Sequence, residues 1–195
     1  FIRHCRTENE KAKKIFTASA GMENFFPANK IVVTGNPVRK EIVQSAVSKK
    51  EALQFFNLDA ATTTILSIGG SLGAQSINEA IARHINEFTE NNLQLIWQTG
   101  KPFKQKAEEV AKNLSNVYVS DFIMRMDMAY AAADLVISRS GAMAIAELSV
   151  VKKPAVFVPY PFAAENHQVA NAKMLVNQNA ALMVKDIEVM EKLVS

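Results

Sequence analysis

Apolar and polar positions follow one repeating pattern along most of the chain. Short runs rich in Val, Ile and Leu end at Gly, Pro or Ser, and each is followed by a stretch with apolar residues at helical spacing. In the clearest such stretch, residues 74–90, the side chains of Ile77, Ile81 and Ile85 fall on one face of a helix. The pattern predicts strands at 15–18, 30–34, 62–68, 93–98, 117–119, 135–138, 154–159 and 181–184, and helices at 51–56, 74–90, 104–113, 127–133, 142–151 and 166–178.

Strands that alternate with helices of about ten residues indicate right-handed β-α-β units around a parallel sheet. Residues 30–186 contain no internal repeat, low-complexity stretch or flexible linker. We therefore expect an α/β fold, a doubly wound parallel sheet, in one domain over residues 30–195. Residues 1–29 are expected to be a connecting segment, and a helix that begins at residue 186 indicates a domain truncated at its C-terminus.

The composition excludes several classes of protein. Hydrophobic residues make up 49% and charged residues 21% of the chain, which argues against disorder. The single cysteine, Cys5, excludes an internal disulfide and zinc sites built from two or four cysteines. No apolar run approaches the roughly 20 residues that span a bilayer, and the first residues lack a signal-peptide stretch, so we expect a cytoplasmic location.

Positive charge gathers at the start of the chain. Residues 1–50 hold ten Lys and Arg against four Asp and Glu, a net charge of +6, while the other 145 residues hold twelve against fifteen, a net charge of −3. Such a segment could steer an anionic ligand or lie near a membrane surface, and it could equally be a solvated helix face. Basic and aromatic residues are not interleaved as in single-strand nucleic-acid binders, so no nucleic-acid partner is expected.

Two glycine loops follow predicted strands, at the edge where an open parallel sheet binds ligands. Residues 69–74 (GGSLGA) lead into the amphipathic helix, so backbone N–H groups and a Ser hydroxyl meet at a helix N-terminus, which is typical of an anion site. A tight turn without a ligand is the alternative. Residues 138–142 (SRSGA) repeat the arrangement, and Glu147 in the next helix could accept hydrogen bonds from a ribose diol or could be a surface glutamate.

Two further loops carry candidate binding residues. Arg39 follows the turn at Pro37, and its planar guanidinium suits a diphosphate, although an exposed arginine at a helix start is the alternative. The loop 159–168 (PYPFAAENHQ) ends in His167 and Gln168, which could hydrogen-bond sugar hydroxyls. Neither an Asp-x-Asp pair nor a spaced Ser/His/Asp set occurs, so no metal site and no covalent nucleophile are expected.

Four strings in order resemble the C-terminal domain of the MurG family: TGNPVR (34–39), ILSIGGSLGA (65–74), DFIMRMDMAYAAADLVISRSGA (121–142) and PAVFVPYPFAAENHQVANA (154–172). These bacterial enzymes transfer N-acetylglucosamine from UDP-N-acetylglucosamine to a lipid-linked muramyl-pentapeptide during peptidoglycan synthesis. The resemblance implies a GT-B glycosyltransferase with two Rossmann-like domains, inverting, metal-independent and without a cofactor. It also implies that the N-terminal domain, which binds the acceptor, is absent, so that this chain alone is inactive and holds no catalytic residue.

The resemblance also implies a role for individual residues. Arg39 and Ser71 would contact the diphosphate, the backbone of Ile123 the uracil, and Glu147 the ribose. Gln168, with His167 beside it, would contact the N-acetylglucosamine, and the segment at the second helix N-terminus would bind phosphate and sugar, namely Ala142, Met143, Ala144, Ile145 and Ala146. Two positions depart from the family, because Ala144 stands where Thr or Ser is usual and His167 stands where some members have Gln.

The expected partners of the whole enzyme are therefore UDP-N-acetylglucosamine, the lipid-linked acceptor through the N-terminal domain, and the cytoplasmic face of the inner membrane as a peripheral contact. Two alternatives stay open from the sequence. One is a related GT-B enzyme, such as a UDP-sugar 2-epimerase or a lipid glycosyltransferase, since sugar identity depends on few residues. The other is a stand-alone nucleotide-sugar binding module without catalysis.

Overall fold

The computed structural model describes residues 11–18, 20–163 and 166–194, and the chain divides into two compact units, Phe1–Val38 and Arg39–Ser195. In the first unit, β1 (Ile15–Thr17) pairs in parallel with β2 (Ile31–Val33), which follows the 3₁₀ helix η1 (Ala28–Lys30). The two strands predicted here are confirmed. The domain boundary expected at residue 30 stays a prediction, and the division between the two units falls after Val38.

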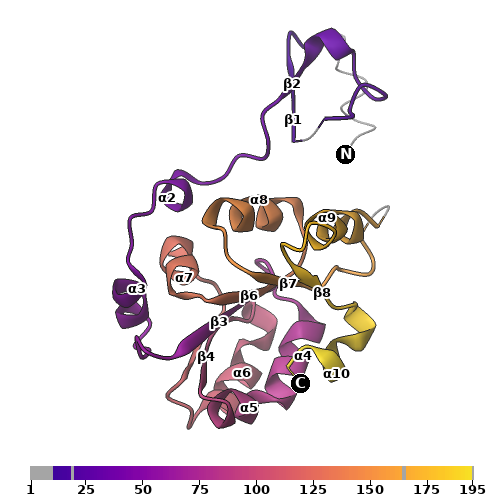
Figure 1. Ribbon diagram of the computed structural model, residues 1–195. Coiled ribbons are helices and arrows are strands. Elements are labelled where there is room, and N and C mark those ends of the chain that lie inside the picture. Colours follow the sequence, from indigo (N-terminus) through magenta and orange to yellow (C-terminus); the bar gives the residue numbers. More distant parts are fainter. Residues whose placement is uncertain (1–10, 19, 164–165, 195) are drawn as a thin grey trace. The chain divides into compact units, whose positions relative to one another are not determined.

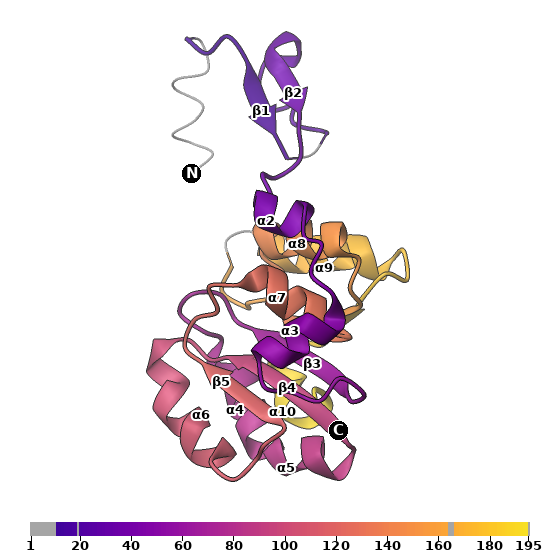
Figure 2. The same cartoon turned by 90° about the vertical axis from the view of Figure 1, so that its left-hand side faces the viewer.

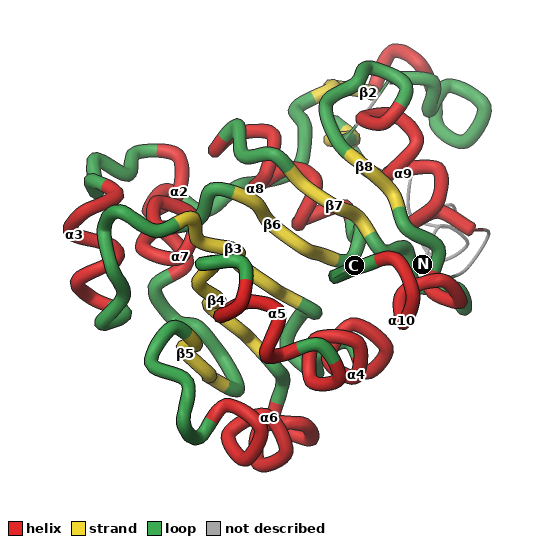
Figure 3. Tube along the Cα trace, turned by 60° about the horizontal axis from the view of Figure 1, so that its bottom comes forward, coloured by secondary structure: helices red, strands yellow, loops and turns green. Residues whose placement is uncertain are grey.

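The second unit is built on a six-stranded parallel sheet in the order β5-β4-β3-β6-β7-β8. The chain starts at the centre, adds two strands on one side, and then returns to add three on the other (Figure 3). The order therefore reverses between β3 and β6, which confirms the doubly wound sheet. The strands are β3 (Thr63–Ile68), β4 (Leu93–Gln98), β5 (Val117–Ser120), β6 (Leu135–Ser138), β7 (Ala155–Phe157) and β8 (Leu182–Met183).

Helices cover both faces of this sheet (Figures 1 and 2). One face carries α4 (Gln75–Arg83), α5 (Ile85–Glu90), α6 (Lys104–Ala111) and α10 (Val189–Lys192). The other carries α3 (Lys49–Phe55), α7 (Met126–Ala132), α8 (Ala142–Val151) and α9 (His167–Val176), and α2 (Lys40–Val43) packs against α7 and α8. Two 3₁₀ turns, η2 (Lys101–Phe103) and η4 (Asp186–Glu188), precede α6 and α10.

The strongest apolar periodicity becomes two helices rather than one. Ile77 and Ile81 of α4 are buried with Trp97 of β4 in the main core, as their spacing predicts. The prediction of a single helix over 74–90 is wrong, because the backbone of His84 (φ −107°, ψ 22°) leaves the helical region. Its Nδ1 lies 2.6 Å from Glu87 Oε1 and its Nε2 lies 3.2 Å from the carbonyl oxygen of Met190, so the break is held by side-chain contacts that periodicity does not reveal.

The other predicted elements of the second unit are present, with ends that differ by about two residues, as is usual for helix and strand termini. The short helix α2 was not predicted, because four residues are too few to show a period. No helix within the described residues is long and apolar enough to cross a membrane.

Candidate functional site

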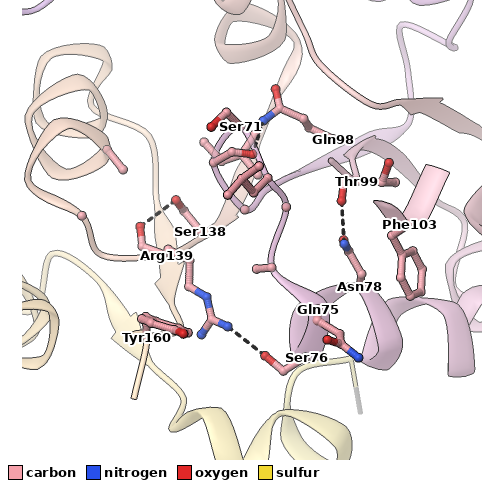
Figure 4. Close-up of a pocket in the computed structure, with 18 of the residues that line it drawn as sticks. Ser71, Gln75, Ser76, Asn78, Gln98, Thr99, Phe103, Ser138, Arg139 and Tyr160 are labelled. Carbon is pink, nitrogen blue, oxygen red and sulfur yellow. Dashed lines mark hydrogen bonds between the residues drawn. The ribbon is translucent and has the colours of Figure 1, made fainter. Parts of the chain in front are cut away.

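A cavity of about 1230 Å³ opens at the carboxyl end of the sheet. Its walls are the loops that follow β3 to β7 and the first turns of α4 and α8 (Figure 4). The cavity includes the point between β3 and β6 where the strand order reverses, which is where doubly wound sheets bind ligands. Small-molecule pockets span about 300–1,000 Å³, so this one has room for a ligand as large as a nucleotide sugar.

The glycine loop after β3 presses closely against the end of β4. Gly70 and Gly73 have positive φ angles of 82° and 77°. A Cβ atom on Gly73 would lie 2.0 Å from the carbonyl oxygen of Thr99, so no other residue fits there. Ala74, which precedes α4, has no side chain that could accept a bond from the first helical turn, and Ser71 lies exposed at the cavity wall. The loop therefore offers backbone N–H groups at a helix N-terminus, as an anion site requires.

Two buried amide side chains that the sequence did not predict act at the end of β4: Gln98 ties it to the glycine loop, and Asn78 ties it to α4. Gln98 Nε2 donates to the carbonyl oxygen of Gly70 at 3.1 Å, while Gln98 Oε1 accepts a bond from the Ile123 N–H at 3.0 Å. Asn78 Nδ2 donates to the carbonyl oxygen of Thr99 at 2.7 Å (Figure 4), and its Oδ1 accepts a bond from Trp97 Nε1 at 2.9 Å. A signal was present, since each amide lies among positions that periodicity places in the core.

The second glycine loop brings α8 to the same cavity. Gly141 precedes α8 and lines the wall together with Met143, Ala144 and Glu147. Glu147 is 8% exposed, so the alternative of a surface glutamate is wrong. The remaining predicted residues of this helix do not line the wall: Ala142 is exposed, and Ile145 and Ala146 are half-buried outside it.

The two charged residues predicted to bind a ligand are paired with each other. Arg39 donates to Glu147 Oε1 from Nε at 3.2 Å and from Nη2 at 3.1 Å. The second oxygen, Oε2, accepts a bond from the Tyr130 hydroxyl at 2.9 Å. Burial, together with the neighbouring Glu147 carboxylate, raises the pKa of Tyr130 well above its usual range, so the phenol stays protonated and donates.

Arg139 forms the centre of a second polar cluster at the cavity wall. It donates to Ser76 Oγ at 3.0 Å (Figure 4). It also donates to the carbonyl oxygens of Val158 and Pro159 at 3.1 and 3.3 Å and to the carboxylate of Asp186. The Ser76 hydroxyl also donates to Asp186 Oδ1 at 2.6 Å. This cluster was not predicted, because its members come from four separate segments of the chain.

Of the two residues predicted at the start of α9, only Gln168 lines the cavity. Its Oε1 accepts a bond from the Tyr160 N–H at 3.0 Å, and its carbonyl oxygen accepts one from the Ser140 hydroxyl at 2.8 Å. His167 is exposed and lies outside the cavity lining. The structure thus brings seven predicted residues to one cavity, namely Arg39, Ser71, Ile123, Met143, Ala144, Glu147 and Gln168.

No group of three or more His, Cys, Asp or Glu side chains within the described residues is arranged to hold a metal ion.

A doubly wound sheet with glycine loops at two helix N-termini is the arrangement of Rossmann-like nucleotide-binding domains. Residues 64–195 match the family model described as the glycosyltransferase family 28 C-terminal domain. The chain belongs to this family.

Curated relatives of this chain carry the name UDP-N-acetylglucosamine–N-acetylmuramyl-(pentapeptide) pyrophosphoryl-undecaprenol N-acetylglucosamine transferase. The protein from Parabacteroides distasonis is 49% identical over 187 residues, which cover 95% of this chain and 51% of the relative. The protein from Bacteroides thetaiotaomicron is 50% identical over 188 residues, covering 94% and 50%. The chain therefore spans about half the length of the curated relatives that it matches.

Solved structures agree with the GT-B fold that the sequence resemblance implies. MurG of Acinetobacter baumannii is 30% identical, with a TM-score of 0.65, and the match covers 93% of this chain and 50% of that one. The UDP-GlcNAc 2-epimerase of Neisseria meningitidis, solved with UDP-GlcNAc bound, has a TM-score of 0.61 at 16% identity and covers 93% and 51%. The second likeness shows a shared fold only.

Proposed function

We propose that this chain binds UDP-N-acetylglucosamine in the cavity and forms the donor-binding half of a transferase. The whole enzyme would move N-acetylglucosamine to the lipid-linked muramyl-pentapeptide, as the names of the relatives state for those proteins. One observation carries the proposal: Arg39, Ser71, Glu147 and Gln168, from four separate segments, line a single cavity at two helix N-termini. The family match and the relatives favour a transferase over an epimerase.

The chemistry of the donor explains why this arrangement suits it. When the sugar leaves UDP, negative charge grows on the diphosphate and must be stabilised in the transition state. The N-termini of α4 and α8 and the Arg39 guanidinium provide positive potential at the cavity. We infer an inverting, metal-independent transfer in which these groups take the part that a divalent cation plays elsewhere.

Each part of the donor has a proposed partner. The diphosphate lies against Ser71 and Arg39, the ribose against Glu147, and the uracil against the backbone of Ile123. Only Gln168 of the two α9 candidates reaches the cavity, so we assign it the N-acetylglucosamine contact. Because the relatives' acceptor carries an undecaprenol chain, we further propose that the whole enzyme works at the cytoplasmic face of a membrane as a peripheral protein.

Isothermal titration calorimetry with EDTA present tests the binding proposal. We expect UDP-N-acetylglucosamine and UDP to bind without added metal, and we expect Arg39→Ala to weaken both. Arg83→Ala, at the end of α4 outside the cavity lining, is the matched control and should leave binding unchanged. Binding that appears only with Mg²⁺ or Mn²⁺ would contradict the metal-independent mechanism, and the absence of any uridine nucleotide binding would contradict the function.

A further inference from the structure

The carboxylate of Glu147 is almost fully engaged before any ligand is considered. Oε1 accepts two bonds from Arg39 and Oε2 accepts one from Tyr130. A carboxylate has about four acceptor positions, so one remains. A ribose diol donates from two hydroxyls. At least one of the present bonds must therefore break before Glu147 can hold both hydroxyls.

The two partners of Glu147 differ in how freely they can move. The Arg39 side chain is 47% exposed and precedes α2, a helix of four residues. Tyr130 is 2% exposed and lies in α7, which packs against α3 and β3. Reorienting the tyrosine would disturb this packing, whereas the arginine can turn into the cavity that it already lines. The bonds that break when the ribose binds are therefore those from Arg39.

We propose that Tyr130 is a positioning residue that holds Glu147 by Oε2, so that Oε1 can exchange Arg39 for a ribose hydroxyl while the carboxylate stays in place. The released guanidinium then turns to the diphosphate. Tyr130 touches the ribose only through Glu147. This inference rests on the proposed function, since it concerns how the same cavity recognises the ribose of a uridine nucleotide.

The test compares two ligands on the full 195-residue chain by calorimetry: UDP, and 2′,3′-dideoxy-UDP, which lacks both ribose hydroxyls. Tyr130→Phe keeps the buried ring and removes only the hydroxyl. We expect it to weaken UDP binding about tenfold and dideoxy-UDP binding less than about twofold, as expected for a bond to a charged group that matters only when the diol is present. Tyr118→Phe is the matched control, because that ring packs on Phe56 and lies outside the cavity lining.

A double-mutant cycle separates positioning from a merely structural role. If Tyr130 acts through Glu147, adding Tyr130→Phe to Glu147→Ala should cause no further loss of UDP affinity. Equal losses for UDP and dideoxy-UDP in Tyr130→Phe, or unchanged UDP affinity, would overturn the positioning role while leaving the proposed function intact. A wild-type chain that binds neither nucleotide would overturn both.

Discussion

Gln98 shows how one side chain can set the spacing between two walls of the cavity. It is 5% exposed and stands at the end of β4, with its amide nitrogen on Gly70 and its amide oxygen on the Ile123 N–H. These two contacts lie on the loops assigned to the diphosphate and the uracil. The distance between the two loops therefore depends on an amide that can donate at one end and accept at the other.

Gln98→Glu tests this dependence with the smallest change of shape. Glutamate can still accept from Ile123, but it places a second oxygen against the Gly70 carbonyl. We expect the binding free energy of UDP to weaken by about 1–3 kcal/mol, the range for leaving a buried hydrogen-bond partner unsatisfied. Calorimetry measures the loss, and Gln54→Glu on the exposed face of α3 is the control. Equal UDP affinities for the two variants would show that Gln98 does not set the spacing of the two loops.

At the residue scale, the sequence predicts which side chains reach the cavity better than it predicts their partners. Arg39 and Glu147 follow recognisable motifs, so both were placed at the ligand edge. Their pairing was not predicted, because 108 positions separate them and the pair depends on how α2 packs on α8. The contact of Tyr130 with Glu147 was not predicted either, because the position of Tyr130 in the apolar stretch 126–133 indicates only a core residue.

At the scale of secondary-structure elements, the hydrogen bonds around Arg139 connect four segments of the chain at the rim of the cavity. Arg139 follows β6, Ser76 lies in the first turn of α4, Val158 and Pro159 follow β7, and Asp186 opens η4. The Arg139 and Asp186 side chains are only 14% and 22% exposed. Their contacts fix the start of α4, the helix that directly follows the glycine loop.

Arg139→Ala should therefore destabilise the fold. Removing the guanidinium breaks the ion pair with Asp186, which keeps only the bond from Ser76, and takes the donor from the carbonyl oxygens of Val158 and Pro159. We therefore expect the free energy of unfolding to fall by about 3 kcal/mol. Urea denaturation measures the loss. Lys104→Ala is the control: it removes contacts of 3.8 Å to Glu108 and 3.7 Å to Asp121, all between side chains at least 41% exposed, and it should leave stability nearly unchanged. A wild-type midpoint for Arg139→Ala would show that the cluster does not support α4.

Element positions were predictable because buried strands and amphipathic helices have distinct periods. The apolar run of β3 and the helical spacing of α4 needed no tertiary information. The break at His84 did, because it depends on a carbonyl at Met190, far along the chain. The order of the strands in the sheet could not be predicted either, because periodicity shows where each strand lies in the sequence but not which strands pair.

At the scale of the whole molecule, the donor contacts that we propose leave two requirements of catalysis without an assigned residue. Inverting transfer needs a base beside the acceptor hydroxyl and an acceptor held in line with the bond between sugar and phosphate. Every cavity residue with a proposed ligand contact serves the donor. His167, the one candidate histidine, is exposed and lies outside the cavity lining.

We therefore expect the 195-residue chain by itself to bind UDP-N-acetylglucosamine and to transfer no sugar. With donor and lipid-linked acceptor supplied, UDP release should stay at background, while the full-length transferase of Parabacteroides distasonis, assayed alongside, should release UDP and so verify the acceptor. Calorimetry on the same preparation must show donor binding, so that a lack of turnover does not reflect a misfolded chain. Acceptor-dependent UDP release by the 195-residue chain would contradict the donor-half assignment, and His167 would then be the first residue to substitute in the search for a base.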